Sequence, residues 1–312
     1  MPKLVSIIVL TYNSRRHLEL LFQSIKLQSY PAIELIVVDN ASQDDTVPYM
    51  RSQTIRPVDQ LIVNQENYWF AKGNNIGIAA SHGEYIYICN DDVALDKDCL
   101  LHLVAALEAD TQRAMVGPKV LKLVDGKPSA QFDSAGLQQF RSGRTINRGE
   151  NAVDTNQYDV AEPVFGITGA AMMLRRAALE QSKFEHEYFD EVFVAYKEDV
   201  DSSWRLARLG YEAYYEPKAI AYHARTMQKH SLQQRHGTRS VIRIYSYRNH
   251  WWTLIKNLSL FEAVKRAPWL IPYECAKLAF VLTREWSTLA AIPQCLKGLP
   301  RMWRKRQYYA NL

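Results

Sequence analysis

Four apolar runs associated with helical segments dominate residues 1–115 and limit the fold more than any other feature. The runs are rich in β-branched and aromatic residues, as buried strands are, and they lie at 5–12, 34–42, 60–64 and 84–92. Around them, apolar periodicity predicts helices after Ser14, at about 74–81 and at 97–109. Strands and helices that alternate at this spacing form right-handed crossovers. The sequence therefore predicts an α/β fold, with a mainly parallel sheet flanked by helices.

Polar side chains gather where each predicted strand ends. They are Thr11, Tyr12 and Asn13 after the first strand, Asp39 and Asn40 after the second, Asn64 and Asn67 after the third, and Asn90, Asp91 and Asp92 after the fourth. Ligands of open parallel sheets bind outside the carboxyl ends of the strands. We therefore expect these polar groups to line one binding rim.

Two adjacent carboxylates, Asp91 and Asp92, stand at the tip of the fourth predicted strand. Like charges this close repel each other unless a cation lies beside them. A divalent ion held by one or two carboxylates and by phosphate oxygens of a substrate is the usual arrangement. The alternative is that the pair only begins a turn, or caps the helix that follows Asp96.

Six segments, taken in order, resemble the inverting family 2 glycosyltransferases of the GT-A fold, particularly the bacterial branch that includes rhamnosyltransferases. They are VSIIVLTYNS at 5–14, IELIVVDNASQDDT at 33–46, NQENYWFAKGNNIGI at 64–78, YIYICNDDV at 85–93, FGITGAAMMLRR at 165–176 and FDEVFVAYKEDVDSSWRLARLGY at 189–211. The resemblance implies a GT-A (Rossmann-like) glycosyltransferase domain at about 1–240. We expect a C-terminal helical appendage at 241–312.

The resemblance implies a nucleotide-sugar donor and a divalent cation, Mg²⁺ or Mn²⁺. The donor-binding positions that it implies are Thr11, Asn13, Asp39, Asn67, Asn74, Asn90, Asp91 and Gly169. Among them, Asp39 would bind the base or the ribose, and Gly169 would approach the transferred sugar. Asp92 takes the metal position of the family's Asp-x-Asp motif, in which Asn90 replaces the first Asp and supplies no charge. Trp69 and Lys72 also depart from the family, which has Gly and a small residue at these positions.

The chemistry of glycosyl transfer explains why a second acidic motif is needed. Direct displacement at an anomeric carbon inverts that carbon and requires a base for the acceptor hydroxyl and a cation for the departing diphosphate. The segment YKEDVD at 196–201 places carboxylates at the start of a predicted helix. By resemblance Asp199 is the base, and Glu198 steers the acceptor or the base. The alternative is that these acids only stabilise a helix N-terminus.

His223 follows a strand-like run and matches a family position that contacts the metal or the diphosphate. A lone His is often structural, but Arg225, Lys229 and His230 follow it closely. We expect this loop to close over phosphates.

Residues 241–312 differ from the rest of the chain in charge and in aromatic content. They carry twelve Lys and Arg against three Glu, a net charge of +9, and five of the seven tryptophans, whereas the net charge of the whole chain is +5. Trp and basic residues suit a lipid headgroup layer, and the apolar stretches fall far below the roughly 20 residues of a transmembrane helix. We expect a helix pair that lies on a membrane. The alternatives are a basic helical cap packed on the domain, or a nucleic-acid surface, for which no binding motif is present.

The resemblance to the rhamnosyltransferase branch implies an enzyme of cell-surface polysaccharide assembly that moves L-rhamnose from dTDP-rhamnose. The basic, Trp-rich tail suggests a polyprenyl-linked saccharide as the acceptor and a peripheral position on the cytoplasmic face of the inner membrane, with no nucleic-acid partner. A UDP- or GDP-linked hexose donor stays open as an alternative, as does a catalytically silent nucleotide-sugar-binding subunit. A dinucleotide oxidoreductase would need a G-x-G-x-x-G motif after the first strand, which this chain lacks.

The N-terminus and the cysteines indicate a reducing compartment. The apolar run at 5–12 is followed by polar residues and by no small-residue cleavage site, so we interpret it as a strand and not as a signal peptide. The four cysteines have neither the close pairing of a zinc site nor the density of a disulfide scaffold.

Overall fold

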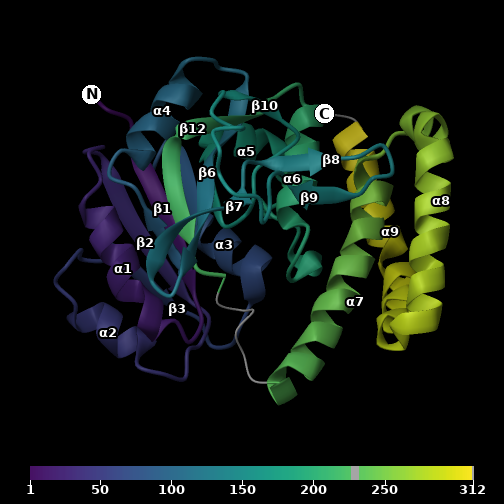
Figure 1. Cartoon of the computed structure of the whole chain (residues 1–312), viewed down its shortest axis with the longest axis horizontal. Coiled ribbons are helices and arrows are strands. Elements are labelled where there is room, and N and C mark those ends of the chain that lie inside the picture. Colours follow the sequence, from purple (N-terminus) through teal and green to yellow (C-terminus); the bar gives the residue numbers. More distant parts are fainter. Residues whose placement is uncertain (226–231, 311–312) are drawn as a thin grey trace.

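The structure is a computed structural model that describes residues 1–225 and 232–310. Lys229 and His230 of the expected phosphate-binding loop lie outside the described residues. A body built around a twisted sheet stands beside a layer of long C-terminal helices (Figure 1).

A large mixed sheet forms the centre of the body (Figure 1). The strands of the protein are β1 (Val5–Thr11), β2 (Ile33–Asp39), β3 (Gln60–Val63), β4 (Tyr85–Asn90), β5 (Val93–Leu95), β6 (Arg113–Val124), β7 (Lys127–Ser134), β8 (Leu137–Gln139), β9 (Thr145–Asn147), β10 (Glu162–Val164), β11 (Ala171–Arg175) and β12 (Glu212–His223). The order along the sheet is β10-β12-β6-β11-β4-β1-β2-β3, with β5 paired to β12 and β7 paired to β6. A separate hairpin is formed by β8 and β9.

Parallel pairing dominates the centre of this sheet. β1 pairs in parallel with β2 and β4, β2 with β3, and β6 with β12, while β11 runs antiparallel between β4 and β6. The predicted mainly parallel sheet flanked by helices is thereby confirmed. Because β1, β2 and β4 share one direction, their polar carboxyl ends meet at one edge of the sheet.

Helices cover both faces of the sheet. Successive strand residues point to opposite sides, so the apolar strands present side chains to the helices on both faces. They are α1 (Arg15–Lys26), α2 (Thr46–Ser52), α3 (Trp69–Ala80), α4 (Cys99–Glu108), α5 (Arg176–Ser182), the short 3₁₀ helix η1 (Glu191–Phe193) and α6 (Glu198–Arg208). Val5, Ile7 and Val9 pack with α1, α2 and α4, whereas Ile8 packs with α3, α5 and α6. The sheet is buried on both faces, so its polar groups reach solvent at the strand ends.

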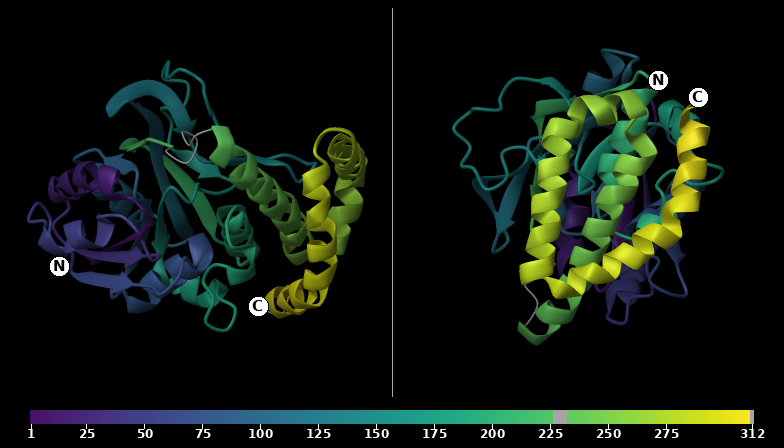
Figure 2. Two further views of the ribbon diagram at one scale, coloured as in Figure 1. Left: turned by 90° about the horizontal axis from the view of Figure 1, so that it is seen from below. Right: turned by 90° about the vertical axis from the view of Figure 1, so that its right-hand side faces the viewer.

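The C-terminal helices form a layer of their own beside the body (Figure 2). The layer consists of α7 (Leu232–Asn257), α8 (Leu260–Arg284), the 3₁₀ helix η3 (Trp286–Ala290) and α9 (Ala291–Ala310). α7 begins before the predicted domain boundary at residue 240, and three long helices stand where a pair was expected. Within residues 1–225 and 232–310, none of the helices combines the length and the apolar character that crossing a membrane requires.

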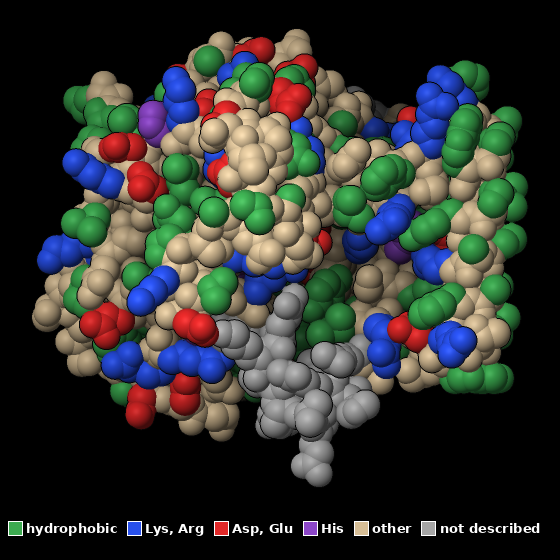
Figure 3. All heavy atoms as spheres, in the orientation of Figure 1, with side chains coloured by type: hydrophobic (Ala, Val, Ile, Leu, Met, Phe, Trp, Pro, Cys, Tyr) green, Lys and Arg blue, Asp and Glu red, His purple; other side chains and the backbone are tan. Residues whose placement is uncertain are grey.

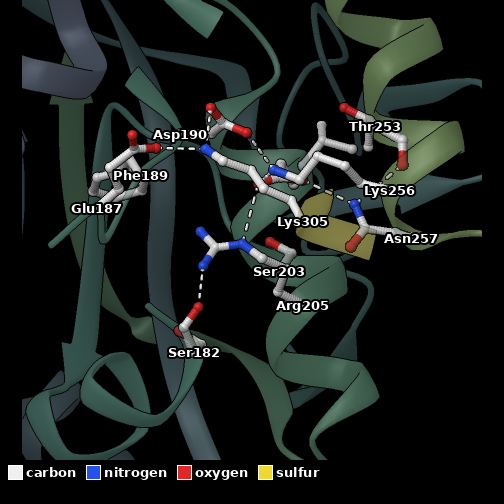
Figure 4. A network of polar contacts seen from close by, with 12 residues as sticks. Ser182, Glu187, Phe189, Asp190, Ser203, Arg205, Thr253, Lys256, Asn257 and Lys305 are labelled. Atoms are coloured by element: carbon white, nitrogen blue, oxygen red, sulfur yellow. Dashed lines mark hydrogen bonds and ion pairs between the residues drawn. The ribbon is translucent and has the colours of Figure 1, made fainter. Parts of the chain in front are cut away.

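A buried charge network joins this layer to the body (Figure 4). Lys256 Nζ of α7 lies 2.6 Å from Asp190 Oδ2 and 2.9 Å from Asp201 Oδ2. Lys305 Nζ of α9 lies 2.5 Å from Glu187 Oε2 and 2.7 Å from Asp190 Oδ1. Both lysine side chains are fully buried. Two of the cations that give the tail its positive charge are therefore part of the protein interior.

Candidate active site

The ends of β1 and β2 bring Thr11 and Asp39 together, because these two residues are register partners. The Asp39 carboxylate is fully buried and accepts hydrogen bonds from Thr11 Oγ1 at 2.9 Å and from the N–H of Ser42 at 2.8 Å. Ser42 Oγ donates to the same carboxylate at 2.5 Å and accepts from the Asn13 N–H at 2.9 Å. Thr11, Asn13 and Asp39 thus form one connected group, and their part in a donor pocket stays a prediction.

Two further asparagines predicted for the donor side, Asn67 and Asn74, lie around the start of α3. Asn67 Oδ1 accepts from the Trp69 N–H at 2.8 Å and so fixes the turn into the helix. Asn74 is buried and donates to the Phe70 carbonyl at 2.9 Å. Its Oδ1 is buried without a hydrogen-bond partner among the residues that the structure describes. A buried acceptor of this kind is expected to find a partner in a ligand or a water molecule.

The two positions that depart from the family also lie in this region. Lys72 Nζ stands 3.5 Å from the ring centre of Tyr68, so a cation–π contact holds it. Trp69 meets Tyr245 of α7 edge to face, with the ring centres 6.2 Å apart. Trp69 therefore connects the start of α3 to the helical layer.

The carboxylates of Asp91 and Asp92 have different partners. Ser14 Oγ donates to Asp91 Oδ2, which ties the tip of β4 to the start of α1. Asp92 Oδ1 lies 3.1 Å from His223 Nε2, because β5, which follows Asp92, pairs with the end of β12. The other ring nitrogen of His223, Nδ1, lies 2.9 Å from Asp133 Oδ2. Asp133 of β7 is almost fully buried and also binds the Arg225 side chain.

Burial and neighbouring charges shift the pKa values of this group. Burial, with a smaller contribution from Asp92, raises the pKa of Asp91 to about 7, against the hydrogen bond from Ser14. Burial by itself lowers the pKa of His223, but Asp133 and Asp92 outweigh it and raise that pKa to about 9. A metal ion at this point would bind the neutral form of the imidazole, so its binding would release the proton that Asp133 and Asp92 favour.

The donor set at this point fits a divalent metal ion. Carboxylate oxygens with one imidazole nitrogen suit Mn²⁺ well and Mg²⁺ acceptably. Asp133 fixes the orientation of the His223 ring and leaves Nε2 directed at Asp92, the arrangement by which a second carboxylate orients a metal-binding His. Asp92 and His223 are the residues that would hold the ion, and Asp133 would support His223.

The second acidic motif begins α6, where Glu198 and Asp201 are buried and Asp199 is half-buried. Asp199 Oδ2 accepts from the Gly169 N–H at 3.1 Å, and Asp199 Oδ1 accepts from the N–H of Val200 at 2.8 Å. A Cβ on Gly169 would lie 2.9 Å from Phe70 Cζ, so a residue without a side chain lets the backbone at 169 pass this close to the Phe70 ring. Gly169 is followed by Ala170, whose carbonyl accepts from the Asn90 N–H at 3.0 Å. This short path joins Asp199 to the strand end that carries the Asp91–Asp92 pair.

The three acids of this motif have separate environments. Glu198 is 5% exposed, and its Oε1 has no hydrogen-bond partner within the described part of the chain. Burial, with a smaller contribution from Asp199, raises the pKa of Glu198 to about 8, and burial also raises the pKa of Asp199. Asp201 instead binds Lys256, as well as Arg205 at 3.1 Å. Asp201 thus belongs to the charge network, whereas Glu198 and Asp199 keep affinity for a proton.

Sequence reasoning missed two groups that contact the site. Asp133 lies in the segment QFDSAG, where its only signal is a charge inside a strand-like run. Asn249 of α7 donates to carbonyls of the loop that precedes Glu198, and no local pattern in RNHWW indicates this role. Both contacts join segments far apart in the chain.

Known proteins resemble this chain in sequence. A family model described as "Glycosyl transferase family 2" matches residues 6–182. A poly-beta-1,6-N-acetyl-D-glucosamine synthase from Staphylococcus epidermidis is 24% identical over 295 residues, which cover 89% of this chain and 65% of the synthase. An N-acetylglucosaminyl-diphospho-decaprenol L-rhamnosyltransferase from Mycobacterium tuberculosis is 26% identical over 246 residues, covering 72% of this chain and 76% of that protein. The chain spans only part of several relatives: 49% of a second Staphylococcus epidermidis synthase and 39% of a Streptococcus pneumoniae glycosyltransferase.

Solved structures resemble it in fold. The mannosyltransferase PcManGT from Pyrobaculum calidifontis, solved with GDP-Man and Mn²⁺, superimposes with a TM-score of 0.59. It is 20% identical, and the match covers 99% of this chain and 86% of the mannosyltransferase. A match at this level of identity bears on the fold, and it extends through the C-terminal helices.

Proposed function

The chain belongs to glycosyl transferase family 2, and from this premise we propose that it is a metal-dependent, inverting glycosyltransferase that uses Asp199 as its base. The observation that supports this proposal most is the path from Asp199 through Gly169 and Ala170 to Asn90. This path leads from a half-buried acid of raised pKa to the strand end that carries a carboxylate–histidine pair. A base and a cation site next to each other are what inverting transfer requires.

The proposed roles follow from these surroundings. Asp199 takes the proton from the acceptor hydroxyl as that oxygen attacks the anomeric carbon, and Glu198 steers the acceptor. Thr11, Asn13 and Asp39 hold the nucleoside, with Asn67, Asn74, Asn90, Asp91 and Gly169 around the rest of the donor. Asp92 and His223 hold Mg²⁺ or Mn²⁺, which would neutralise charge on the departing nucleoside diphosphate when bound.

The donor is proposed to be dTDP-rhamnose and the acceptor a polyprenyl-linked saccharide. The mycobacterial relative is named for rhamnosyl transfer to a diphospho-decaprenol-linked sugar, which supports both choices. The complex of the mannosyltransferase with GDP-Man keeps a GDP- or UDP-linked hexose as the second candidate. A silent binding subunit would have no need for Asp92, Asp199 and His223 together.

We further propose that α8 and η3 rest on the cytoplasmic face of the inner membrane. Large apolar side chains stand in solvent there, among them Phe261 at 78%, Trp269 at 46% and Trp286 at 69% exposure. Figure 3 shows apolar side chains along the outer edge of the helical layer, with basic groups between them. An exposed apolar face that carries Trp and basic residues fits a lipid interface.

The basic part of this surface is smaller than the sequence suggests. Arg301 pairs with Glu187 at 2.5 Å, and Arg306 donates to the backbone carbonyls of Ile255 and Leu258 at 2.7 and 2.6 Å. Lys305 is buried against Glu187. These three cations therefore bind groups of the protein. The proposed attraction to lipid is therefore mainly apolar.

A two-step measurement tests the catalytic proposal. Thermal shifts with Mn²⁺ present are first recorded for dTDP-rhamnose, UDP-hexoses and GDP-hexoses, and the stabilising donor is then incubated with a diphosphate-linked N-acetylglucosamine acceptor. We expect one donor class to stabilise the protein and to give a glycosylated product of inverted configuration. Stabilisation without transfer would favour the silent subunit, and a product of retained configuration would refute the single displacement.

A further inference from the structure

We propose that Asn249 of α7 is a positioning residue that holds the Glu198–Asp199 pair in its reactive place. This inference rests on the proposed function, in which Glu198 and Asp199 act on the acceptor. It goes beyond that function because it gives the C-terminal helical layer a direct part in building the catalytic site. The inference is based on the backbone conformation of the loop at 192–197, which leads into α6.

This loop has a backbone conformation that its residues do not favour. Val194, Tyr196 and Lys197 have φ angles of 66°, 73° and 75°, in the left-handed region that glycine tolerates best. A β-branched residue such as Val194 is especially rare there. Such backbone persists only where the surroundings hold it.

One side chain supplies most of that support. Asn249 is fully buried, and its Nδ2 donates to the carbonyls of Phe193 at 2.8 Å, Ala195 at 2.9 Å and Tyr196 at 2.8 Å. The positive φ angles turn these carbonyls toward α7, where a single amide group gathers them. An aspartate or an alanine at this position would leave buried carbonyls without a donor, which is costly in a low-dielectric interior.

Neighbouring donors complete the arrangement. Arg248 Nη2 donates to the carbonyls of Val192 at 2.9 Å and Phe193 at 3.0 Å. The N–H of Phe70, in the first turn of α3, donates to the Val194 carbonyl at 3.2 Å. Each carbonyl from 192 to 196 therefore receives a hydrogen bond from another segment of the fold. The Lys197 carbonyl, next in line, already accepts from the first turn of α6.

Asn249 is a sharper probe of this arrangement than Arg248. The Arg248 guanidinium also binds Gln294 of α9 at 2.9 Å and stands 4.3 Å from the ring centre of Trp252. Its loss would disturb the helical layer itself. The Asn249 amide nitrogen instead faces the loop, so its loss acts on the backbone that ends at Glu198.

A matched control lies two turns further along the same helix. Asn257 is also fully buried, and its Nδ2 donates to Asp201 Oδ1 at 2.8 Å instead of to the loop. Asn249→Ala and Asn257→Ala therefore remove the same amide from the same helix. They differ in whether the loop at 192–197 loses its donor, and in that Asn249 Oδ1 also accepts from Arg248 Nε at 3.0 Å.

We expect Asn249→Ala to lower the turnover number about 100-fold, because misplacement of a catalytic group by about 1 Å has this effect. Affinity for the nucleoside diphosphate with Mn²⁺, measured by calorimetry, should not change. The acid limb of the turnover–pH profile should move to lower pH, since a loosened loop hydrates Glu198 and Asp199 and undoes the effect of burial. Asn257→Ala should lose stability yet keep turnover and pH profile close to those of the wild type.

Hydrogen exchange separates this inference from the proposed function. Amides 193–199 should exchange faster in Asn249→Ala than in the wild type, and should be unaffected in Asn257→Ala. Unchanged turnover in a folded Asn249→Ala protein, or unchanged exchange of these amides, overturns the inference. If the wild type transfers no sugar from any donor, the proposed function fails, and the exchange of these amides alone decides whether Asn249 holds the loop.

Discussion

At the scale of single residues, the two acidic pairs of the site differ in their partners and therefore in their chemistry. Asp91 and Asp92 stand beside Ser14 and His223. Burial and then Asp92 raise the pKa of Asp91, whereas Asp133 and Asp92 raise the pKa of His223 against the effect of burial. Glu198 is buried and Asp199 half-buried, and desolvation raises the pKa of each. The negative charge of Asp91 and Asp92 favours binding of a cation, whereas the raised pKa values of Glu198 and Asp199 favour proton transfer.

Replacing Asp92 tests the cation site. Asp92→Asn removes the negative charge that would bind the ion and leaves the side-chain volume almost unchanged. We expect the fold to persist and the gain in nucleotide-sugar affinity that Mn²⁺ produces to disappear. Isothermal titration with and without Mn²⁺ measures this gain, and a gain equal to that of the wild type would contradict the assignment.

Replacing Asp199 tests the base. Asp199→Asn should lower turnover by about 10² to 10⁴, the range for loss of a positioned base, with donor affinity nearly unchanged. Asp201→Asn is the matched control in the same helix, because Asp201 is bound by Lys256 and Arg205. Asp201→Asn should lower the stability of the protein and change turnover much less than Asp199→Asn does. Near-normal turnover in Asp199→Asn would instead point to Glu198 as the base.

At the scale of the elements, the buried network of Figure 4 fixes α6, α7 and α9 relative to one another. Asp190 lies between two lysines from different helices, Lys256 and Lys305. Burial by itself raises the pKa of Asp190, but the two lysines outweigh it and hold that pKa far below its usual value. Burial also lowers the pKa of Lys256, yet Asp190 and Asp201 raise it to about 12. The helices can therefore dock only with these charges paired.

Removal of one cation should reveal the strength of this docking. We expect Lys256→Met to lower the free energy of unfolding by about 3 kcal/mol at pH 7, since buried acids lose a partner. Arg304→Ala is the control, because the Arg304–Glu185 pair is exposed and should contribute about 1 kcal/mol or less. Urea unfolding monitored by circular dichroism measures both. Equal losses in the two variants would show that the buried network contributes no more than a surface pair.

The pH dependence of the same variant has a definite sign. The folded-state pKa of Asp190 lies below its unfolded value, so the stability that it contributes is present above about pH 4 and is lost as pH falls further. The difference between the wild type and Lys256→Met should therefore shrink below about pH 4. A difference that stays constant down to the acid transition would argue against this pairing.

At the scale of the whole molecule, the helical layer has two faces with different tasks. Its inner face carries Asn249, Lys256 and Lys305 against the body, and its outer face carries exposed Phe261 and Trp286. A layer that binds the catalytic loop on one side and lipid on the other would place the acceptor chemistry close to a membrane surface. Figure 3 shows a hollow between the body and this layer.

Vesicle flotation tests the outer face. We expect a variant with Phe261, Trp269 and Trp286 all changed to Ser to lose binding to anionic vesicles at both low and high salt, because the lost contribution is hydrophobic. Val160→Ser, an equally exposed apolar residue on the body, is the control and should bind normally. Equal recovery of the triple variant and the wild type would favour a helical cap that faces water.

The sequence by itself determined the strand order along the chain and the edge of the sheet at which the polar strand ends meet. Apolar runs and helical periodicity are local patterns, and the right-handed crossover rule converts them into a parallel sheet with polar strand ends at one edge. Thr11, Asp39 and Asp92 could be placed there because each directly follows or ends such a run. The start of α3 at Trp69 was not predicted, since the glycine and asparagines of FAKGNN give no helical signal.

Only the tertiary structure decided which charges and amides meet. The sequence counts the cations of the tail, but it does not show that Lys305 lies against Glu187 and Asp190 instead of facing a membrane. It likewise shows neither Asp133 behind His223 nor Asn249 beneath the loop at 192–197. These pairs join residues far apart in the chain, and their partners are set by how the helical layer docks on the sheet. Docking depends on packing between distant segments, which no local pattern records.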